Sequence, residues 1–434
     1  MTKVLLIGDL RTSISNYGAF ANSENLINEL KKKSDIELKC IDGRSFWKKT
    51  PKDGWETSTE DYIKAAREKQ LRENKVQRVK RIIKKVPFAA ELIKKLRKHE
   101  MEIFVPAQIK DYESFSKRVV IGEELQYEKN LIEWADAVLI NGEGNIVRGT
   151  DKNGYYRLGG LYVLYIAYLS KVVCKKKTYI INHTVDPGNR DIIEIIKSIY
   201  PLMDGIYIRE RLSINLLRKW GVENAKLIPD TLFLYGQNEV MCALSANYKE
   251  WRDYSKKLVC VGDSSGIENV YTKVKWDVKK FYNSLIGRLK EQGYQVAFID
   301  GFDGNNDELN EICIHNNILH LHMSNCSYQE LYQIYKETAV YISGRWHTSI
   351  LALQAGCPIV LWGADSHKTE ALYDLIDYPF TFFDVNTLPI HVDDILEEIN
   401  LVLKADNTKV FEKVKCIMEE AKQIVNIFED DEDK

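Results

Sequence analysis

SGRWHTSILALQAGCPIVLWG, residues 343–363, is the stretch from which the fold is best predicted. Its pattern predicts the end of a strand, a tight turn, a short helix and, after Gly356-Cys-Pro358, a second apolar strand. In an α/β sheet such a turn opens into the crevice at the strand carboxyl ends, where helix N-termini attract anions. Arg345 and His347 stand in the first turn of the predicted helix and are therefore candidate site residues.

The length and charge of the chain set its broad class. A chain of 434 residues is long for one core, so we expect two domains with appendages. The 61 Lys and Arg residues nearly balance the 63 Asp and Glu residues, which leaves no overall field to draw the molecule to nucleic acid. We therefore expect no nucleic-acid partner and look for binding sites locally.

The cysteines and apolar runs predict a cytoplasmic location. The eight cysteines are scattered, with no Cys-x-x-Cys pair, as is usual in a reducing compartment. The apolar run near Met1 is too short for a secretory leader, and the run from Leu161 to Leu169 is well below the roughly 20 residues that span a bilayer.

The first unit of the chain is predicted as a strand (Val4–Ile7), a polar loop (Gly8–Ala21) and a helix that begins after Ser23. This order is Rossmann-like. The loop contains Asn16 and Gly18 at a place where a ligand can bind, but it lacks a Gly-x-Gly-x-x-Gly pattern, so a dinucleotide is not favoured.

Polar residues follow three later strands of the same half. Asn141 and Glu143 stand in a glycine-flanked turn after a buried strand, His183 follows the next strand, and Arg209 lies in the next strand-to-helix turn. These positions favour a site at the strand carboxyl ends. The alternatives are a plain turn at Glu143, a histidine bonded to neighbouring backbone at 183, and a structural Arg209–Glu pair.

A basic segment interrupts the first half. Residues 58–100 read as helical, with apolar residues at helix spacing and Lys and Arg on the opposite face, densest within 75–98. One interpretation is peripheral contact with the inner face of a membrane or with an anionic carrier lipid. The other is a solvated helical insertion packed on the domain.

The polar stretch 237–255 is the predicted domain boundary, because Leu227–Phe233 reads as the last strand of the first half and Lys257 restarts the strand-then-loop order. The fold class is therefore α/β, with two tandem Rossmann-like domains facing a cleft. The predicted parts are an N-terminal domain with the helical insertion, a C-terminal domain, and a helical segment with an acidic tail: 1–236, 256–390 and 391–434.

A histidine-rich run near residue 320 raises the question of a metal site. His320 and His322 stand within Ile318–Met323, whose alternation predicts a strand, and no second close pair supplies further ligands. We therefore expect no bound metal there.

Five groups of residues recur at the predicted strand ends and turns: Asn16-Tyr-Gly18, Asn141-Gly-Glu-Gly144, Arg209-Glu210 with Ser213, Pro229-Asp230, and Ser343-Gly-Arg-Trp-His347 with Ala355-Gly-Cys-Pro358. Taken together, these motifs resemble the polysaccharide pyruvyltransferase family over most of the chain, the basic insertion and the tail excepted. Glu143 departs from the family pattern, because it replaces the middle of a glycine triplet, and Ala19 stands where an acid is common.

The resemblance implies a fold like the two-domain glycosyltransferase B class and a reaction that moves a pyruvyl group from phosphoenolpyruvate to two hydroxyls of one sugar, making a cyclic ketal. Guanidinium groups and helix N-termini suit the carboxylate and phosphate of that donor. Protonation of the enol carbon needs an acid with a pKa near neutrality, and histidine is the side chain that meets this need. Phosphoenolpyruvate is then a co-substrate, and no cofactor or metal is expected.

By the same resemblance His347 is the leading general acid or base, Arg345 is the anion clamp, and His183 is a second candidate for activating a sugar hydroxyl. Arg209 supports the clamp from the other domain. The remaining substrate-binding candidates are Asn16, Gly18, Asn141, Glu143, Ser343, Gly344, Thr348 and Lys368.

Two other functions remain open from the sequence. A sugar-nucleotide-dependent glycosyltransferase of the same fold would hold a diphosphate at Gly262–Gly266 and ribose at Glu370. A non-catalytic glycan-binding scaffold would account for the altered first loop and for Glu143. The acceptor, whether polymer, lipid-linked unit or nucleotide sugar, and the oligomeric state are not determined by the sequence.

Overall fold

The computed structural model describes residues 1–11, 16–43, 105–147, 158–237, 242–268, 274–301 and 307–427. The predicted basic helices within 58–100, with the membrane contact assigned to 75–98, and the acidic tail lie outside these residues. Among the helices that are described, none combines the length and the apolar character that crossing a bilayer requires.

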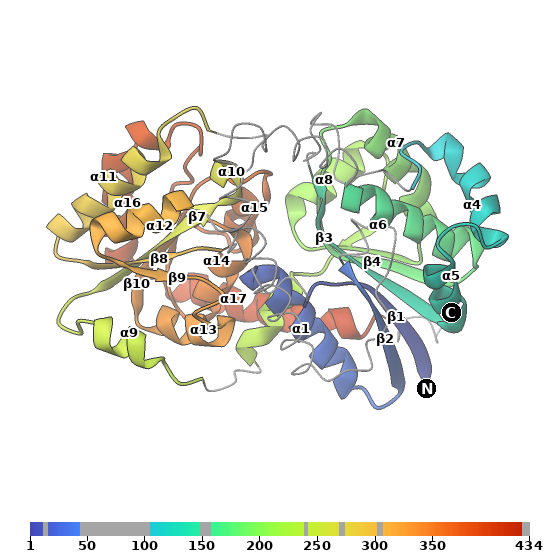
Figure 1. Ribbon diagram of the computed structural model, residues 1–434, viewed down its shortest axis with the longest axis horizontal. Helices are drawn as coiled ribbons and strands as arrows, with labels where there is room; N and C mark the ends of the chain where they lie inside the picture. The colour runs from blue at the N-terminus through green and yellow to red at the C-terminus, as the bar shows by residue number, and fades with distance from the viewer. Residues whose placement is uncertain are drawn as a thin grey trace, which may run out of the picture.

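Two separate parallel sheets form the framework, and they confirm the predicted pair of tandem Rossmann-like domains (Figure 1). The first sheet has the order β2-β1-β3-β4-β5-β6, and the second has the order β11-β10-β7-β8-β9. The strands are β1 (Thr2–Asp9), β2 (Ile36–Asp42), β3 (Ala137–Val147), β4 (Lys177–Asp186), β5 (Gly205–Ile208), β6 (Ala225–Leu227), β7 (Leu258–Ser264), β8 (Gln295–Ile299), β9 (Leu319–Leu321), β10 (Thr338–Gly344) and β11 (Ile359–Leu361).

Helices alternate with the strands along the chain and cover both sheets (Figure 1). Those of the first half are α1 (Tyr17–Lys32), α4 (Tyr112–Val120), α5 (Gln126–Trp134), α6 (Leu158–Tyr168), α7 (Arg190–Ile199) and α8 (Arg211–Lys219), followed by the 3-10 segment η6 (Thr231–Gln237). Those of the second half are α9 (Ala246–Trp251), α10 (Ser265–Glu268), α11 (Val278–Glu291), α12 (Asp307–Asn316), α13 (Tyr328–Lys336), α14 (Trp346–Gln354), α15 (Lys368–Leu375), α16 (Val392–Lys404) and α17 (Thr408–Ala421), with the 3-10 segment η8 (Lys422–Val425).

The central strands contain apolar runs, such as residues 4–7 of β1 and 137–140 of β3, because both of their faces are buried there. In β1, Val4 and Leu6 face the layer between the two domains, whereas Leu5 and Ile7 face the outer helical layer. Side chains alternate across a strand, so every residue of such a run enters one core or the other.

An apolar layer joins the two domains, with α1, α14 and α17 in the middle of the view (Figure 1). Within it the Tyr17 hydroxyl of the first domain donates to the Cys326 carbonyl of the second over 2.9 Å. Tyr235 and Tyr328 pack edge to face with their ring centroids 5.1 Å apart. The domains therefore contact each other through a continuous core.

Two local predictions were wrong. Helix α1 begins at Tyr17 rather than after Ser23, because the Asn16 side chain accepts from the backbone N–H groups of Gly18 and Ala19 and caps the helix. The strand predicted over Leu227–Phe233 ends at Leu227, since Pro229 has no N–H to donate to a ladder and the chain then turns into η6.

The C-terminal helices divide between the two domains. Helix α16 packs on β10 and β11 of the second sheet, whereas α17 packs on η6 and α14 in the layer between the domains. Just after α17, the Asn426 side chain accepts from the Lys33 ammonium over 2.7 Å. The chain therefore returns to the first domain after it has completed the second.

Candidate functional site

Four charged side chains meet where the first sheet faces the N-terminus of α14. His347 Nε2 lies 2.9 Å from Glu143 Oε1 and 3.5 Å from Asp230 Oδ2. Arg209 Nη1 lies 2.9 Å from Asp230 Oδ2 and 3.6 Å from Glu143 Oε1. Three of these residues come from the first domain and His347 comes from the second, so the cluster is assembled only when the domains meet.

The two carboxylates favour the charged form of His347. Burial works to lower the pKa of His347, but Glu143 and Asp230 outweigh burial and raise it above its ordinary value. Burial would raise the pKa of Glu143, but His347 and Arg209 hold it at about 2. The pKa of Asp230 is likewise lowered, against burial, by His347 and Arg209. An arginine, a histidine whose charged form is favoured and two carboxylates therefore share one small volume.

Within the cluster, two side chains are almost fully buried and two are partly exposed. Arg209 and Asp230 keep 1% and 0% of their side-chain surface exposed, whereas His347 and Glu143 keep 15% and 10%. A ligand that approaches this cluster therefore meets the imidazole and the Glu143 carboxylate first.

Asp230 is the anchor of the cluster. Its carboxylate accepts from Asn22 Nδ2 and Trp346 Nε1, both over 2.8 Å, and from the Leu232 backbone N–H over 2.9 Å. The indole of Trp346 also lies 5.1 Å from the Arg209 guanidinium carbon, a cation–π contact across the domain boundary.

A buried amide network supports Asp230 from below. Asn182 Nδ2 donates to Asn22 Oδ1 over 2.8 Å and to Asn141 Oδ1 over 3.1 Å. Asn141 has no exposed surface, so the structure gives this predicted substrate-binding residue a place beneath the site. Sequence reasoning missed Asn22, Asn182 and Trp346. The available signals were that Asn182 directly precedes the candidate His183 and that Trp346 stands between Arg345 and His347.

The structure places Asn16 and Gly18 at the start of α1, directly against α14. Asn16 caps α1. A β-carbon on Gly18 would lie 2.0 Å from Nδ1 of His347, so only glycine leaves room for the imidazole. The glycine of the first loop thus serves the position of His347.

His183 is fully buried in β4 and lies against Tyr200, with 2.9 Å between its Nε2 and the tyrosine hydroxyl. Burial, with the nearby Arg209 charge, lowers the pKa of His183 to about 3, so the ring is neutral at physiological pH. A β-carbon on Gly142 would lie 2.7 Å from the His183 β-carbon. His183 thus fills space behind the glycine turn that carries Glu143.

Arg345 is the N-cap of α14, and its guanidinium forms an ion pair with Asp263 of β7. The Ser343 hydroxyl accepts from the Arg345 N–H over 3.0 Å and donates to the Asp263 carbonyl over 3.1 Å.

The other predicted residues of this turn are packed against their neighbours. Gly344 lies against Ser264 and Trp362. Thr348 is buried and shares a hydrogen bond of 2.8 Å with Tyr341. Ser343, Gly344 and Thr348 therefore fix the turn that presents Arg345.

A second polar contact crosses the domain boundary near Lys368. His367 Nε2 lies 3.2 Å from Glu210 Oε1 and 3.2 Å from Ser213 Oγ, and its Nδ1 lies 3.8 Å from Asp186 Oδ2. Lys368 donates to Asp365 over 2.6 Å in the same loop. Burial works against the charge on His367, but Glu210 and Asp186 raise its pKa. Sequence reasoning did not single out His367.

Several solved structures match this architecture. Anabaena Alr3699/HepE, solved in complex with UDP, matches with a TM-score of 0.53 and 11% identity, covering 98% of this chain and 97% of that chain. Sucrose-phosphate synthase from Thermosynechococcus elongatus matches with a TM-score of 0.52 and 12% identity, covering 99% of each chain. At these identities the likeness shows the fold alone, which is of the glycosyltransferase B type.

Sequence comparison is more specific. The amylovoran biosynthesis protein AmsJ of Erwinia amylovora is 23% identical over 340 residues, which cover 74% of this chain and 78% of that protein. The model of the polysaccharide pyruvyl transferase family matches residues 16–363, a span that contains Glu143, Arg209, Asp230, Arg345 and His347. Because this match covers most of the chain and the whole interdomain cluster, the chain belongs to the polysaccharide pyruvyl transferase family.

Proposed function

We propose that this transferase moves the pyruvyl group of phosphoenolpyruvate onto two hydroxyls of one sugar in a cell-surface polysaccharide or its precursor, forming a cyclic ketal. The observation that carries the proposal is the imidazole of His347, which lies against Glu143 and Asp230 beside the Arg209 guanidinium, where the two carboxylates favour its charged form. An imidazolium is the acid that the donor's enol carbon requires, and the arginines supply the counter-charges for its carboxylate and phosphate.

The reaction has a simple atom balance in this site. His347 gives a proton to C3 of phosphoenolpyruvate while a sugar hydroxyl oxygen bonds to C2, so that the methylene becomes a methyl group. The second hydroxyl oxygen then bonds to C2 as the C2–O bond to phosphate breaks. Of the two hydroxyl protons, one replaces the proton that His347 gave and the other leaves with inorganic phosphate, so the imidazolium is regenerated.

Arg345 is assigned the role of anion clamp in this scheme. Asp263 fixes the direction of its guanidinium, and the turn of Ser343 and Gly344 fixes its backbone. A planar guanidinium held in this way can bind a carboxylate or phosphate with two parallel hydrogen bonds. The Glu143 carboxylate lies closer to the His347 imidazole than that of Asp230 does, and we assign to it the receipt of a hydroxyl proton from the sugar.

The glycosyltransferase alternative has less support from the described residues. Its predicted diphosphate turn contains Gly262 and Gly266, and both lie where a side chain does not fit. A β-carbon on Gly262 would lie 2.4 Å from the Tyr341 hydroxyl, and one on Gly266 would lie 2.9 Å from the Ala364 carbonyl oxygen. Packing alone accounts for these glycines.

The test is acceptor-dependent release of phosphate from phosphoenolpyruvate, with His347→Ala as the variant and His391→Ala as the matched control. His391 is half-exposed and pairs with Asp394 away from the cluster. We expect release by the wild type and the control and none by His347→Ala. We also expect phosphoenolpyruvate, and not nucleotide sugars, to raise the melting temperature.

Stabilisation by nucleotide sugars alone would favour the glycosyltransferase. Binding of glycans with no phosphate release from any acceptor in a panel of polymeric and lipid-linked saccharides would favour the non-catalytic scaffold.

A further inference from the structure

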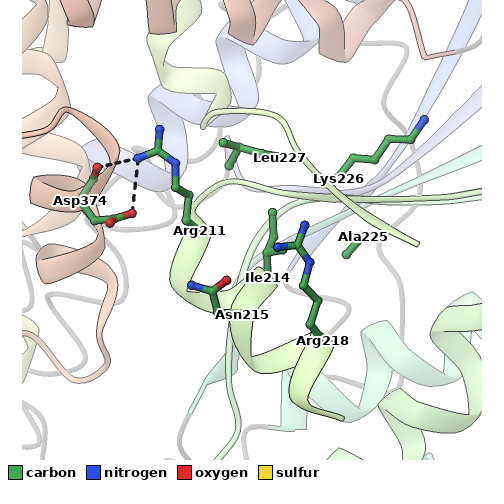
Figure 2. Close-up of a pocket in the computed structure, with 8 residues that line it drawn as sticks. All are labelled: Arg211, Ile214, Asn215, Arg218, Ala225, Lys226, Leu227 and Asp374. Atoms are coloured by element: carbon green, nitrogen blue, oxygen red, sulfur yellow. Dashed lines mark hydrogen bonds and ion pairs between the residues drawn. The ribbon is translucent and has the colours of Figure 1, made fainter. Parts of the chain in front are cut away.

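A basic pocket of about 480 Å³ lies at the domain boundary, next to the cluster but outside it. Figure 2 shows Arg211 and Asn215 along α8, with Arg218 one turn further, facing the strand that carries Lys226. These helix positions are spaced by four and three residues, which puts them on one face of α8. Asp374 of the second domain closes one side.

The charge of the pocket is unbalanced. Arg211 is neutralised by Asp374, with 3.5 Å between Nη1 and Oδ2 and a further hydrogen bond to the Asp374 carbonyl. Arg218 and Lys226 are exposed, and neither side chain has an ion pair or hydrogen bond to any other described residue. A cation in the last turn of a helix is expected from the helix dipole, which accounts for Arg218 but not for Lys226 on the facing strand.

The rest of the lining suits a sugar ring. Ile214 and Ala225 are buried and, with Leu227, give an apolar floor, while the Asn215 carboxamide offers a donor and an acceptor. Strand β6 is the edge of the first sheet, so its outer backbone groups face the pocket region without a neighbouring strand. An apolar floor with a few polar groups and two cations matches a sugar that carries an acidic group.

The pocket is close enough to the cluster to serve the same ligand. Arg211 follows Arg209 by two residues, so their α-carbons are at most about 7 Å apart. Arg209 points into the cluster and Arg211 forms the near wall of the pocket. From there the pocket extends along α8 to Arg218, about 10 Å further on. A chain of a few sugar units can span this distance.

We propose that this pocket binds a carboxylate or phosphate group carried by the acceptor saccharide. The acceptor is then held at two points, its reacting sugar beside His347 and its acidic group between Arg218 and Lys226. The identity of the ligand as the acceptor rests on the proposed function, whereas the preference for an acidic saccharide rests on the pocket.

The test is calorimetric titration without phosphoenolpyruvate, so that it does not depend on catalysis. The probes are a glucuronate-terminated tetrasaccharide, glucose 1-phosphate, neutral maltotetraose and inorganic phosphate. We expect the wild type to bind at least one acidic saccharide at least about 10-fold more tightly than maltotetraose. In the double variant Arg218→Gln/Lys226→Gln, the affinity for that acidic saccharide should fall on the order of 10-fold for each cation removed. The control is Lys219→Gln, an exposed cation of α8 that does not line the pocket, and it should bind like the wild type.

Tight binding of the glucuronate probe identifies a carboxylate, and tight binding of glucose 1-phosphate identifies a phosphate. Unchanged binding by the double variant, or binding of inorganic phosphate with neither acidic saccharide, would overturn the proposal. If the double variant does not fold, Arg218→Gln carries the same test. A wild type that binds acidic saccharide but releases no phosphate from phosphoenolpyruvate would uphold the pocket and overturn the pyruvyl-transfer function.

Discussion

Glu143 and His347 meet across the domain boundary, with 2.9 Å between the carboxylate Oε1 and the imidazole Nε2. Glu143 adopts a left-handed backbone with φ at 48°, which is uncommon for a residue other than glycine. Its other oxygen accepts from the Gly144 N–H over 2.7 Å. The strain at Glu143 is thus compensated by contacts that aim its carboxylate at His347.

Replacing Glu143 by Gln should shift the pH dependence of transfer. Because the acid that we propose is the imidazolium, activity should be lost as pH rises through the pKa of His347. Glu143→Gln removes a charge that raises this pKa, so the basic limb of the kcat/KM profile should move to lower pH. Glu419→Gln, on the exposed face of α17, should leave the limb in place. A basic limb that does not move in Glu143→Gln would contradict the role of His347 as the acid.

Replacing Gly18 by Ala should displace the imidazole of His347 without removing any charged group. The added β-carbon would lie 2.0 Å from His347 Nδ1, so the ring or α1 must shift. We expect a loss of activity on the order of 100-fold, as for a misplacement of about 1 Å. Gly287→Ala is the control, because it is also helical and has nothing within 4 Å of the added carbon. That variant should be stabilised by up to about 1 kcal/mol. Full activity in Gly18→Ala would show that the contact does not position His347.

Replacing Arg345 by Lys should reduce turnover far more than stability. Lysine keeps the charge beside Asp263 but loses the planar fork that holds a carboxylate or phosphate. We expect kcat/KM for phosphoenolpyruvate to fall on the order of 100-fold, with a melting temperature close to that of the wild type. Arg288→Lys, at an exposed ion pair with Asp393, provides the matched control. Equal activity in Arg345→Lys would remove Arg345 from the clamp.

The contacts of His367 with the first domain should make the stability of the interface between the domains depend on pH. The pKa of His367 is raised in the folded protein, so its protonated ring stabilises the folded state. This contribution is complete below the pKa of the unfolded chain, about 6.5, and is lost as pH rises through the pKa of the folded state. His367→Gln should therefore lower the melting temperature more at pH 6 than at pH 9. The comparison is His391→Gln, whose exposed pair with Asp394 lies within one domain. An equal effect of His367→Gln at both pH values would show that the imidazolium does not join the domains.

The framework was predictable because the central strands are apolar on both faces. The strand, turn, helix and second strand predicted over residues 343–363 are present as β10, α14 and β11. The errors fall where polar residues serve the site. Asn22 and Ser23 read as part of a loop and its cap, yet both lie within α1, where Asn22 donates to Asp230 and Ser23 accepts from the Leu10 N–H. Local pattern fails at such positions because tertiary hydrogen bonds decide them.

The site itself was predictable only in part. Arg209 could be found because it follows the end of a strand, His347 because it opens a helix, and Glu143 because it stands between two glycines. Asp230 was noticed only as part of Pro229-Asp230, since the chain around it read as a strand. Its role depends on partners up to 208 residues away in sequence, such as Asn22, and no short-range pattern records them.

The return of α17 to the first domain means that the chain passes between the domains at two places, once between η6 and α9 and once between α16 and α17. Two domains that are joined by two chain segments rotate most easily about a hinge axis that passes through both segments. Rotation about that axis would move the domains apart with the least stretching of the two connecting segments. Such a rotation would separate His347 of the second domain from Glu143 of the first, so the imidazole would have both of its carboxylate partners only while the domains are in contact.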